Sequence, residues 1–292
     1  MRNRSENLDK VLSDVSVSTA PSPPLVLTIN ALDPTGADGL VADAVTCATL
    51  GCHTLTAATA MMIQDTAGLE DIQSIAPDNL DNQVRCLLED MTVQAIKVDG
   101  VHSTETASAI AQIAADYSQV PLVLHLGAQV VPSDEAEQEQ AEDQLAATFE
   151  LLIPQADVIV IDHARLSRWI ADGHLRVDEL ATPMHAFLAA GADWVLALGA
   201  PLRPGHATNM LIGSDGTTTH RAMHAPPERS ASAGGVVSAA IAAFMAQGVP
   251  VAAAVERALG HADQAIGQGF VAGMGRRIPR HAAAPFSTRV DE

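Results

Sequence analysis

Short apolar runs alternate with longer amphipathic stretches along most of the chain. Six runs have the length and composition of buried strands, at residues 25–30, 54–61, 93–98, 121–126, 158–161 and 194–198. The stretches between them repeat apolar positions every three or four residues, as a helix packed on a sheet does. This alternation predicts strand–helix–strand units and a parallel sheet, and therefore an α/β fold.

The expected helices cover residues 38–50, 77–90, 104–117, 233–247 and 251–268. Gly51 follows the first of them and is expected to stop it. The acidic stretch 133–143 is expected to begin as a surface loop and to lead into a helix that ends near Ile153. Residues 209–212 and 217–221 flank Gly213-Ser214-Asp215-Gly216, which predicts a β-hairpin.

The two ends of the chain differ in composition from the rest. Residues 1–24 are rich in Ser, Asp and Pro and are expected to form a flexible tail, without the apolar segment of a secretory signal. Residues 25–285 are predicted to form a single domain, followed by a C-terminal tail at 286–292. With 292 residues, 48% of them hydrophobic, the chain is long enough for a sizeable core.

The charge balance excludes one class of partner. Sixteen basic and 35 acidic side chains give a net charge of −19, which repels nucleic-acid phosphates. No apolar run reaches the roughly 18 residues of a membrane span, so no membrane partner is expected. Cys47, Cys52 and Cys86 form no Cys-x-x-Cys pair, which indicates a reducing, cytoplasmic compartment.

A glycine-containing turn follows the first predicted strand. Alone, such a turn is more often structural than functional, because a tight strand-to-helix turn needs glycine whatever it binds. Its residues are Asp33-Pro34-Thr35-Gly36, Gly39-Leu40 and Ala42-Asp43. They resemble the opening pattern of the hydroxymethylpyrimidine/phosphomethylpyrimidine kinases, G-x-D-P-S/T-G-G-A-G-I/L-x-A-D. The chain departs from that pattern at Ala31, Ala37 and Asp38.

Two further segments carry the same resemblance. Gln64-Asp65-Thr66 and Gly68 match the family's Q-N/D-T-x-G turn. Gly269, Gly273, Gly275, Pro279 and His281 resemble its C-terminal end. The resemblance covers about residues 25–281 and implies a ribokinase-like fold, with a mostly parallel central sheet flanked by helices on both faces.

The family's activity gives expectations for substrates and site residues. Its members transfer phosphate from ATP, with Mg²⁺, to the hydroxymethyl group and then to the phosphate of 4-amino-5-hydroxymethyl-2-methylpyrimidine, a thiamine precursor. The resemblance implies that Asp43 and Gln64 hydrogen-bond the aminopyrimidine, as a carboxylate and an amide can. It also assigns Asp33, Gly36 and Gly39 to the substrate site, and Lys97 and Asp162 to nucleotide or phosphate binding. A homodimer is a further expectation.

The residues themselves leave simpler interpretations open. Asp43 could be an ordinary first-turn helix residue that complements the helix dipole, and Gln64 an ordinary turn residue. The segments that match the family's nucleotide-binding parts are also weaker than its opening motif. Lys97 is one of two lysines in the chain and is followed by an added acid, Asp99.

The motif that carries catalysis in this family departs most. The family has G-T/S-G-C/D at a helix N-terminus, where backbone amides form an anion hole and the last residue is the general base. Here the matching residues are Ser232, Ala233, Gly234 and Gly235. Amides at this helix start could still hold a phosphate. Gly235 cannot accept a proton, so the family's base is absent from its position.

Other positions depart in ways that suggest loss or gain. His125 replaces an aspartate, Arg165 reverses the sign of a glutamate, and Leu198 stands where the family's K-G-G-H segment has its lysine. Asp38 and His125 could form an acid–base pair, although isolated residues of this kind are more often solvated. His163 also follows a predicted strand, at the edge where open α/β sheets bind ligands.

A metal site is not expected. His220 and His224 have His-x-x-x-His spacing, but only a helix would put that spacing on one face. The two histidines instead fall near the end of a predicted strand.

These observations predict a phosphomethylpyrimidine kinase-like protein. It would bind 4-amino-5-hydroxymethyl-2-methylpyrimidine or its phosphate and would use ATP and Mg²⁺ if it is active. The loss of the base predicts impaired phosphorylation. The alternatives are a non-catalytic pyrimidine sensor or binding protein, which needs no cofactor, and a structural partner of an active paralogue.

Overall fold

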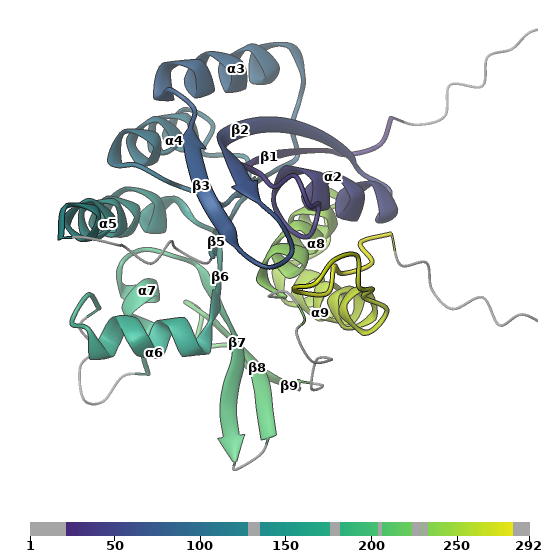
Figure 1. Ribbon diagram of the computed structural model, residues 1–292. Coiled ribbons are helices and arrows are strands. Elements are labelled where there is room, and N and C mark those ends of the chain that lie inside the picture. Colours follow the sequence, from purple (N-terminus) through teal and green to yellow (C-terminus); the bar gives the residue numbers. More distant parts are fainter. Residues whose placement is uncertain are drawn as a thin grey trace, which may run out of the picture.

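The computed structural model describes residues 22–127, 135–175, 182–203, 206–223, 230 and 233–282. A nine-stranded sheet, in the order β3-β2-β1-β4-β5-β6-β7-β8-β9, runs through this part of the chain (Figure 1). Its strands are β1 (Leu25–Leu32), β2 (His53–Gln64), β3 (Leu69–Ser74), β4 (Ala95–Val98), β5 (Leu122–Leu126), β6 (Val158–Asp162), β7 (Trp194–Arg203), β8 (His206–Gly213) and β9 (Thr218–Ala222). The six central strands, in the spatial order β2-β1-β4-β5-β6-β7, pair in parallel. Strands β3, β8 and β9 pair antiparallel with their neighbours. The predicted mostly parallel sheet is confirmed.

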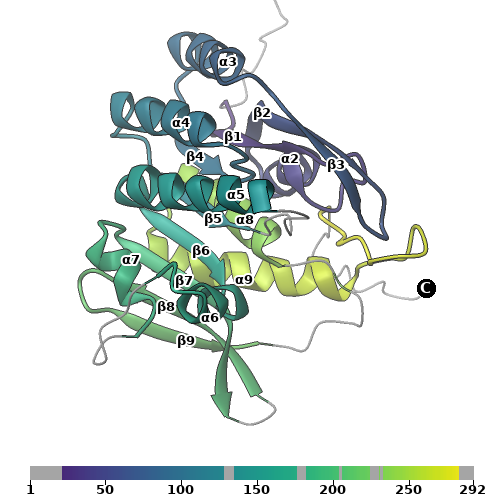
Figure 2. The ribbon, with the colours of Figure 1, turned by 60° about the vertical axis from the view of Figure 1, so that its left-hand side comes forward.

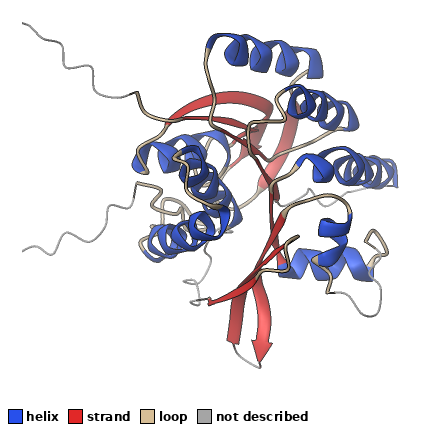
Figure 3. Cartoon of the chain, turned by 180° about the vertical axis from the view of Figure 1, so that it is seen from behind, coloured by secondary structure: helices blue, strands red, loops and turns tan. Residues whose placement is uncertain are grey.

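Helices cover both faces of the sheet, as Figure 3 shows from behind. One face carries α2 (Gly39–Thr49), α8 (Gly234–Ala246) and α9 (Val251–Gly267). The other carries α3 (Pro77–Asp90), α4 (Thr104–Asp116), α5 (Glu135–Ala147), α6 (His163–Ala171) and α7 (His185–Ala189), with short π and 3-10 segments at Thr148–Leu152 and Ile153–Gln155. Each face has its own apolar core, and the sheet separates the two.

The two-residue period of the strands sorts their side chains between these cores. On three neighbouring strands, Val26, Ala95 and Val123 pack with α8. Their chain neighbours Leu27, Ile96 and Leu124 pack with the helices of the other face. Because both faces are buried, the strands are near-continuous apolar runs, which is why the sequence pattern located them.

Most of the predicted elements are present, with shifted ends. The first helix begins after Asp38 and ends before Gly51, as expected, and the hairpin forms between β8 and β9. Helix α5 already begins at Glu135, inside the acidic stretch that was expected to start as a loop. The sequence pattern missed β3, α6 and α7. Strand β3 is largely exposed and polar, and α7 has five residues, so neither shows a clear apolar period.

The C-terminal segment returns to the turns near the start of the domain (Figure 2). The backbone N–H of Gly275 donates to Thr66 Oγ1 at 3.1 Å, and that of Arg276 to the Thr66 carbonyl at 2.7 Å. His281 Nε2 lies 3.2 Å from the carbonyl oxygen of Ala37. Residues that match the family pattern at both ends of the chain are therefore in contact.

Candidate active site

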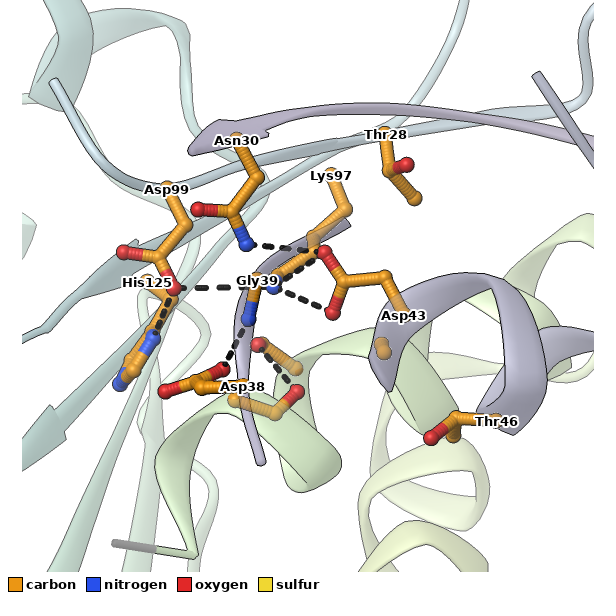
Figure 4. Close-up of polar contacts among 12 residues, drawn as sticks. Thr28, Asn30, Asp38, Gly39, Asp43, Thr46, Lys97, Asp99 and His125 are labelled. Atoms are coloured by element: carbon orange, nitrogen blue, oxygen red, sulfur yellow. Dashed lines mark hydrogen bonds and ion pairs between the residues drawn. The ribbon is translucent and has the colours of Figure 1, made fainter. Parts of the chain in front are cut away.

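Polar side chains interrupt the apolar face of β1, β4 and β5 where it meets α2 and α8. Thr28 on β1 pairs with Lys97 on β4, and Val98 on β4 pairs with Leu124 on β5. Asn30, Asp99 and His125, at or just beyond the carboxyl ends of the same strands, therefore lie beside one another (Figure 4). Carboxyl ends of parallel strands are where open α/β sheets bind ligands.

The deepest part of this cluster is an ion pair between β4 and α2. Lys97 Nζ lies 2.7 and 2.8 Å from the two carboxylate oxygens of Asp43, and both side chains are at most 1% exposed. Asn30 Nδ2 donates to the same carboxylate at 2.9 Å. Burial lowers the pKa of Lys97, but Asp43 and Asp99 outweigh it and raise the pKa, so the lysine stays charged.

A second charged pair lies closer to the edge of the sheet. His125 Nδ1 is 2.6 Å from Asp99 Oδ2, and the histidine is only 4% exposed. Burial lowers the His125 pKa, but the adjacent Asp99 carboxylate outweighs it and raises the pKa. Burial opposes ionisation of Asp99, but His125 and Lys97 together lower its pKa. His125 is thus an oriented and buried imidazole, not the solvated loop residue of the simpler interpretation.

The first turn of α8 lies directly against this pair and against Asp38. A Cβ atom built on Gly234 would lie 2.1 Å from His125 Nε2, and one built on Gly235 would lie 2.1 Å from Asp38 Oδ1. Either contact is far closer than real Cβ atoms allow. Two titratable side chains therefore occupy the space beside the two glycines. His125 Nε2 has no hydrogen-bond partner among the described residues.

A cavity of about 460 Å³ reaches the same edge of the sheet. Asp99 and His125 are among its lining residues, and β3 and α5 contribute Glu70, Asp71 and Glu137. The volume is typical of sites for small molecules. Its acidic lining favours a neutral or amine-bearing ligand over an anion at this point.

The opening turn is organised by Asp33. Its carboxylate accepts hydrogen bonds from the backbone and hydroxyl of Thr35 and from the backbone of Asp38. Gly36 and Gly39 both have positive φ, and a Cβ on Gly39 would lie 2.5 Å from the Ala31 carbonyl oxygen. These contacts give the matching residues a structural role. Their proposed contact with a substrate stays a prediction.

The structure brings only some of the predicted site residues together. Asp43 and Lys97 bind each other, so their predicted roles toward pyrimidine and phosphate stay predictions. Gln64 ends β2 and is half-buried, and neither it nor Asp43 lines the cavity described above. Asp162 ends β6, and His163 begins α6 beside it. Ser232 lies outside the described residues.

The structure also describes three other predicted positions, Ala233, Arg165 and His220. Ala233 is the N-cap residue of α8 and makes no side-chain cap hydrogen bond. Arg165 lies over the Trp169 ring, with its guanidinium carbon 6.0 Å from the ring centre. His220 lies exposed on β9, and His224 is not among the described residues.

Sequence reasoning missed Asn30 and the Asp43–Lys97 ion pair. The signal that could have found them is the two-residue period of a strand, which places alternate residues on the same face. Thr28, Asn30, Lys97, Asp99 and His125 are polar at positions that share one strand face with apolar neighbours, and a buried polar face needs partners.

The described residues contain neither a cluster of metal-binding side chains nor a membrane-spanning helix. No group of three His, Cys, Asp or Glu side chains there could hold a metal ion. None of the helices described combines the length and the apolar character that crossing a bilayer requires.

The sheet order and the charged edge beside the start of α8 define a ribokinase-like α/β protein. The fold is that of Bacillus subtilis pyridoxal kinase, whose structure was solved as an ADP complex. The two share a TM-score of 0.78 at 22% identity, over 90% of this chain and 98% of that one.

The sequence comparisons identify the family within this fold. The model of the phosphomethylpyrimidine kinase family matches residues 33–280, and the chain belongs to that family. The hydroxymethylpyrimidine/phosphomethylpyrimidine kinase of Mycobacterium bovis is 31% identical over 80% of this chain and 85% of its own length. That of Streptomyces coelicolor is 29% identical over 88% of this chain and 95% of its own.

Proposed function

We propose that this protein is an ATP-dependent kinase that phosphorylates the hydroxymethyl group of an aminopyrimidine alcohol, as part of thiamine biosynthesis. The observation that carries the proposal is the convergence of Asp38 and His125 on Gly234 and Gly235 at the start of α8. A phosphoryl acceptor needs a group that takes its proton and donors that stabilise the phosphate. Titratable groups and a helix N-terminus meet here at the carboxyl edge of the sheet.

The groups proposed to donate hydrogen bonds to the phosphate are the α8 backbone amides and His125. A helix N-terminus favours anions because its first amides point outward and its dipole is positive there. His125 would add a hydrogen bond from Nε2, since Nδ1 is held by Asp99. The α8 amides and the His125 N–H would thus provide hydrogen-bond donors for a phosphate within an acidic protein. The nucleotide would bring magnesium with its phosphates, as is usual for such sites.

Family membership and the cavity support a small aromatic alcohol as substrate. The relatives named above are kinases of hydroxymethylpyrimidine and of pyridoxal, and both of these are heteroaromatic alcohols. The acidic lining at Glu70, Asp71 and Glu137 suits the aminopyrimidine alcohol better than its monophosphate. We therefore propose the alcohol as the preferred substrate.

A non-catalytic pyrimidine-binding protein is the second candidate. The observation that favours it is the absence of a side chain at Gly235, where the family has its general base. Both candidates bind pyrimidine, and only the kinase releases ADP in a pyrimidine-dependent way.

The test combines thermal unfolding with an ADP assay on the same samples. The purified protein is mixed with 4-amino-5-hydroxymethyl-2-methylpyrimidine, its monophosphate or pyridoxal, with and without ATP–Mg²⁺. A ligand at 100 times its Kd stabilises the folded state by about 2.7 kcal/mol. Stabilisation with ADP release supports the kinase, and stabilisation without ADP supports the binding protein. No effect of any alcohol contradicts both.

Gln64→Ala tests the predicted pyrimidine contact. We expect affinity for the pyrimidine to fall by about 1–3 kcal/mol, the cost of an unsatisfied polar partner. Gln73→Ala is the matched control, because Gln73 is exposed on β3 and lies outside the segments that match the family pattern. Equal affinity in the two variants would remove Gln64 from the site. Gln64 is preferred over Asp43 for this test because changing Asp43 breaks the buried ion pair.

A further inference from the structure

Two departures from the family pattern, far apart in the sequence, are in contact in the structure. The family has Ala at the position of Asp38 and a Cys or Asp at that of Gly235. A Cβ atom on Gly235 would lie 2.1 Å from Asp38 Oδ1, 2.9 Å from its Cγ and 3.1 Å from its Oδ2. All three of the nearest atoms belong to Asp38. The Asp38 carboxylate therefore takes the space that a side chain at residue 235 would fill.

The turn holds Asp38 firmly in this place. Asp38 is the N-cap residue of α2, and its Oδ1 accepts from the Gly39 backbone N–H at 2.9 Å. Its own N–H donates to Asp33 Oδ2 at 3.1 Å. His281 Nε2 lies 3.2 Å from the carbonyl oxygen of the preceding residue, Ala37. As a residue, Asp38 is half-buried at this point of the turn.

We propose that Asp38 is the general base of the phosphoryl transfer, moved from α8 to the N-cap of α2. This inference rests on the proposed kinase function. In the family the base is a side chain on α8 that points at the substrate hydroxyl. Here Asp38 reaches the same space from the N-cap of α2. Residue 235 on α8 is glycine because the Asp38 carboxylate occupies the place of its side chain.

The chemistry that follows is balanced within the proposed reaction. The hydroxymethyl O–H gives its proton to the Asp38 carboxylate while its oxygen forms a bond to the γ-phosphorus of ATP. The bond between that phosphorus and the bridging oxygen breaks, and ADP leaves with the electron pair. Burial, and next the nearby Asp99, raise the Asp38 pKa. A carboxylate with a raised pKa is a stronger base near neutral pH.

Moving the acidic side chain from residue 38 to residue 235 gives a direct test. Asp38→Asn and Asp38→Ala are compared with Asp38→Ala/Gly235→Asp, in which the acid returns to α8. Gly235 is helical, so its backbone accepts aspartate once the Asp38 carboxylate is gone. Asp78→Asn is the matched control, because Asp78 is an exposed acid in the first turn of α3. Asparagine caps a helix about as well as aspartate, so Asp38→Asn is expected to fold.

We expect Asp38→Asn and Asp38→Ala to lower kcat about 10²- to 10⁴-fold in the full-length protein with the pyrimidine and ATP–Mg²⁺. Asp78→Asn leaves kcat unchanged, and the double variant regains part of what Asp38→Ala lost. The acid limb of the kcat–pH profile, absent from Asp38→Asn, returns at a different pH in the double variant. A merely structural role for Asp38 would not produce that shift.

The possible failures are distinguishable. If the wild-type protein releases ADP and Asp38→Asn does so equally fast, the base assignment is overturned and the kinase function stands. If Asp38→Asn loses activity together with thermal stability and the double variant recovers none, the assignment is also overturned. If the wild-type protein releases no ADP with any alcohol, the proposed function fails, and the base assignment with it.

Discussion

Replacing Lys97 by methionine should destabilise this protein more than any surface change. Lys97 is fully buried between β4 and α2, with both oxygens of the Asp43 carboxylate within 2.8 Å. Its ammonium also lies 3.6 Å from Asp99. Methionine fills a similar volume, so the substitution removes the charge and leaves most of the packing. Two carboxylates then remain buried beside each other with their main cation gone.

The size of the effect follows from burial. Removing one partner of a buried ion pair costs about 3–5 kcal/mol, because the other charge stays desolvated. Asn30 still donates to Asp43, which keeps the expected loss within this range. For a chain of this size, each kcal/mol shifts Tm by roughly 2–4 °C, so Tm should fall by roughly 6–20 °C.

The assay is urea and thermal unfolding followed by circular dichroism. Arg85→Met is the matched control, because Arg85 forms a 2.9 Å pair with Asp81 at a half-exposed site. Exposed pairs of this kind contribute about 0–1 kcal/mol. Asp43→Asn/Lys97→Met should recover part of the loss, since the buried negative charge is then removed and asparagine can still accept from Asn30.

A specific result would refute this reasoning. If Lys97→Met and Arg85→Met lose the same free energy of unfolding, the buried pair adds no more than a surface pair. If the double variant is no more stable than Lys97→Met, the loss does not come from the uncompensated Asp43 charge.

Two further predictions concern the pH response of the cluster and the backbone of the opening turn. His125 has a raised pKa in the folded state, so its stabilising effect is fully present below the unfolded pKa of about 6.5 and is lost as pH rises through the folded value. Asp99 has a lowered pKa, so its stabilising effect is lost as pH falls below about 4. The difference in free energy of unfolding between wild type and His125→Asn, measured by urea unfolding from pH 3 to 9, should therefore be largest near pH 5–6. A difference that stays constant with pH would contradict the ion pair. Gly39→Ala should destabilise by about 1–3 kcal/mol or more, because it adds a clash with a carbonyl oxygen to the cost of positive φ. Gly51→Ala, at a positive φ with open space around it, should cost roughly 1 kcal/mol in the same thermal unfolding assay, and equal losses would show that the clash relaxes.

The strands of the sheet were predictable because their physical signal is local. Residues 158–161 and 194–198 are buried on both faces, so almost every position must be apolar whatever its neighbours are. Strand β3 gave no such signal, since Leu69–Ser74 is mostly exposed and is held by pairing with β2. The start of α5 was also missed, because its acidic residues face solvent and show no apolar period.

In the candidate site too, the features with a local sequence signal were predictable and those that depend on tertiary contacts were not. The family motif located the opening turn and the start of α8, because tight turns demand particular residues at fixed spacing. The sequence could not show that Lys97 is bound to Asp43, or that His125 is oriented by Asp99. Both pairings depend on strand register and on the packing of α2, which bring together residues that lie on different elements.

The sequence by itself determined the alternation of strands and helices, the family, and the loss of a side chain at Gly235. Only the tertiary structure decided what stands in that place. Asp38 and Gly235 meet because α2 and α8 pack side by side on one face of the sheet. A pattern read along the chain records which residues are present, whereas the space beside a glycine is filled by whichever chain segment the fold brings there.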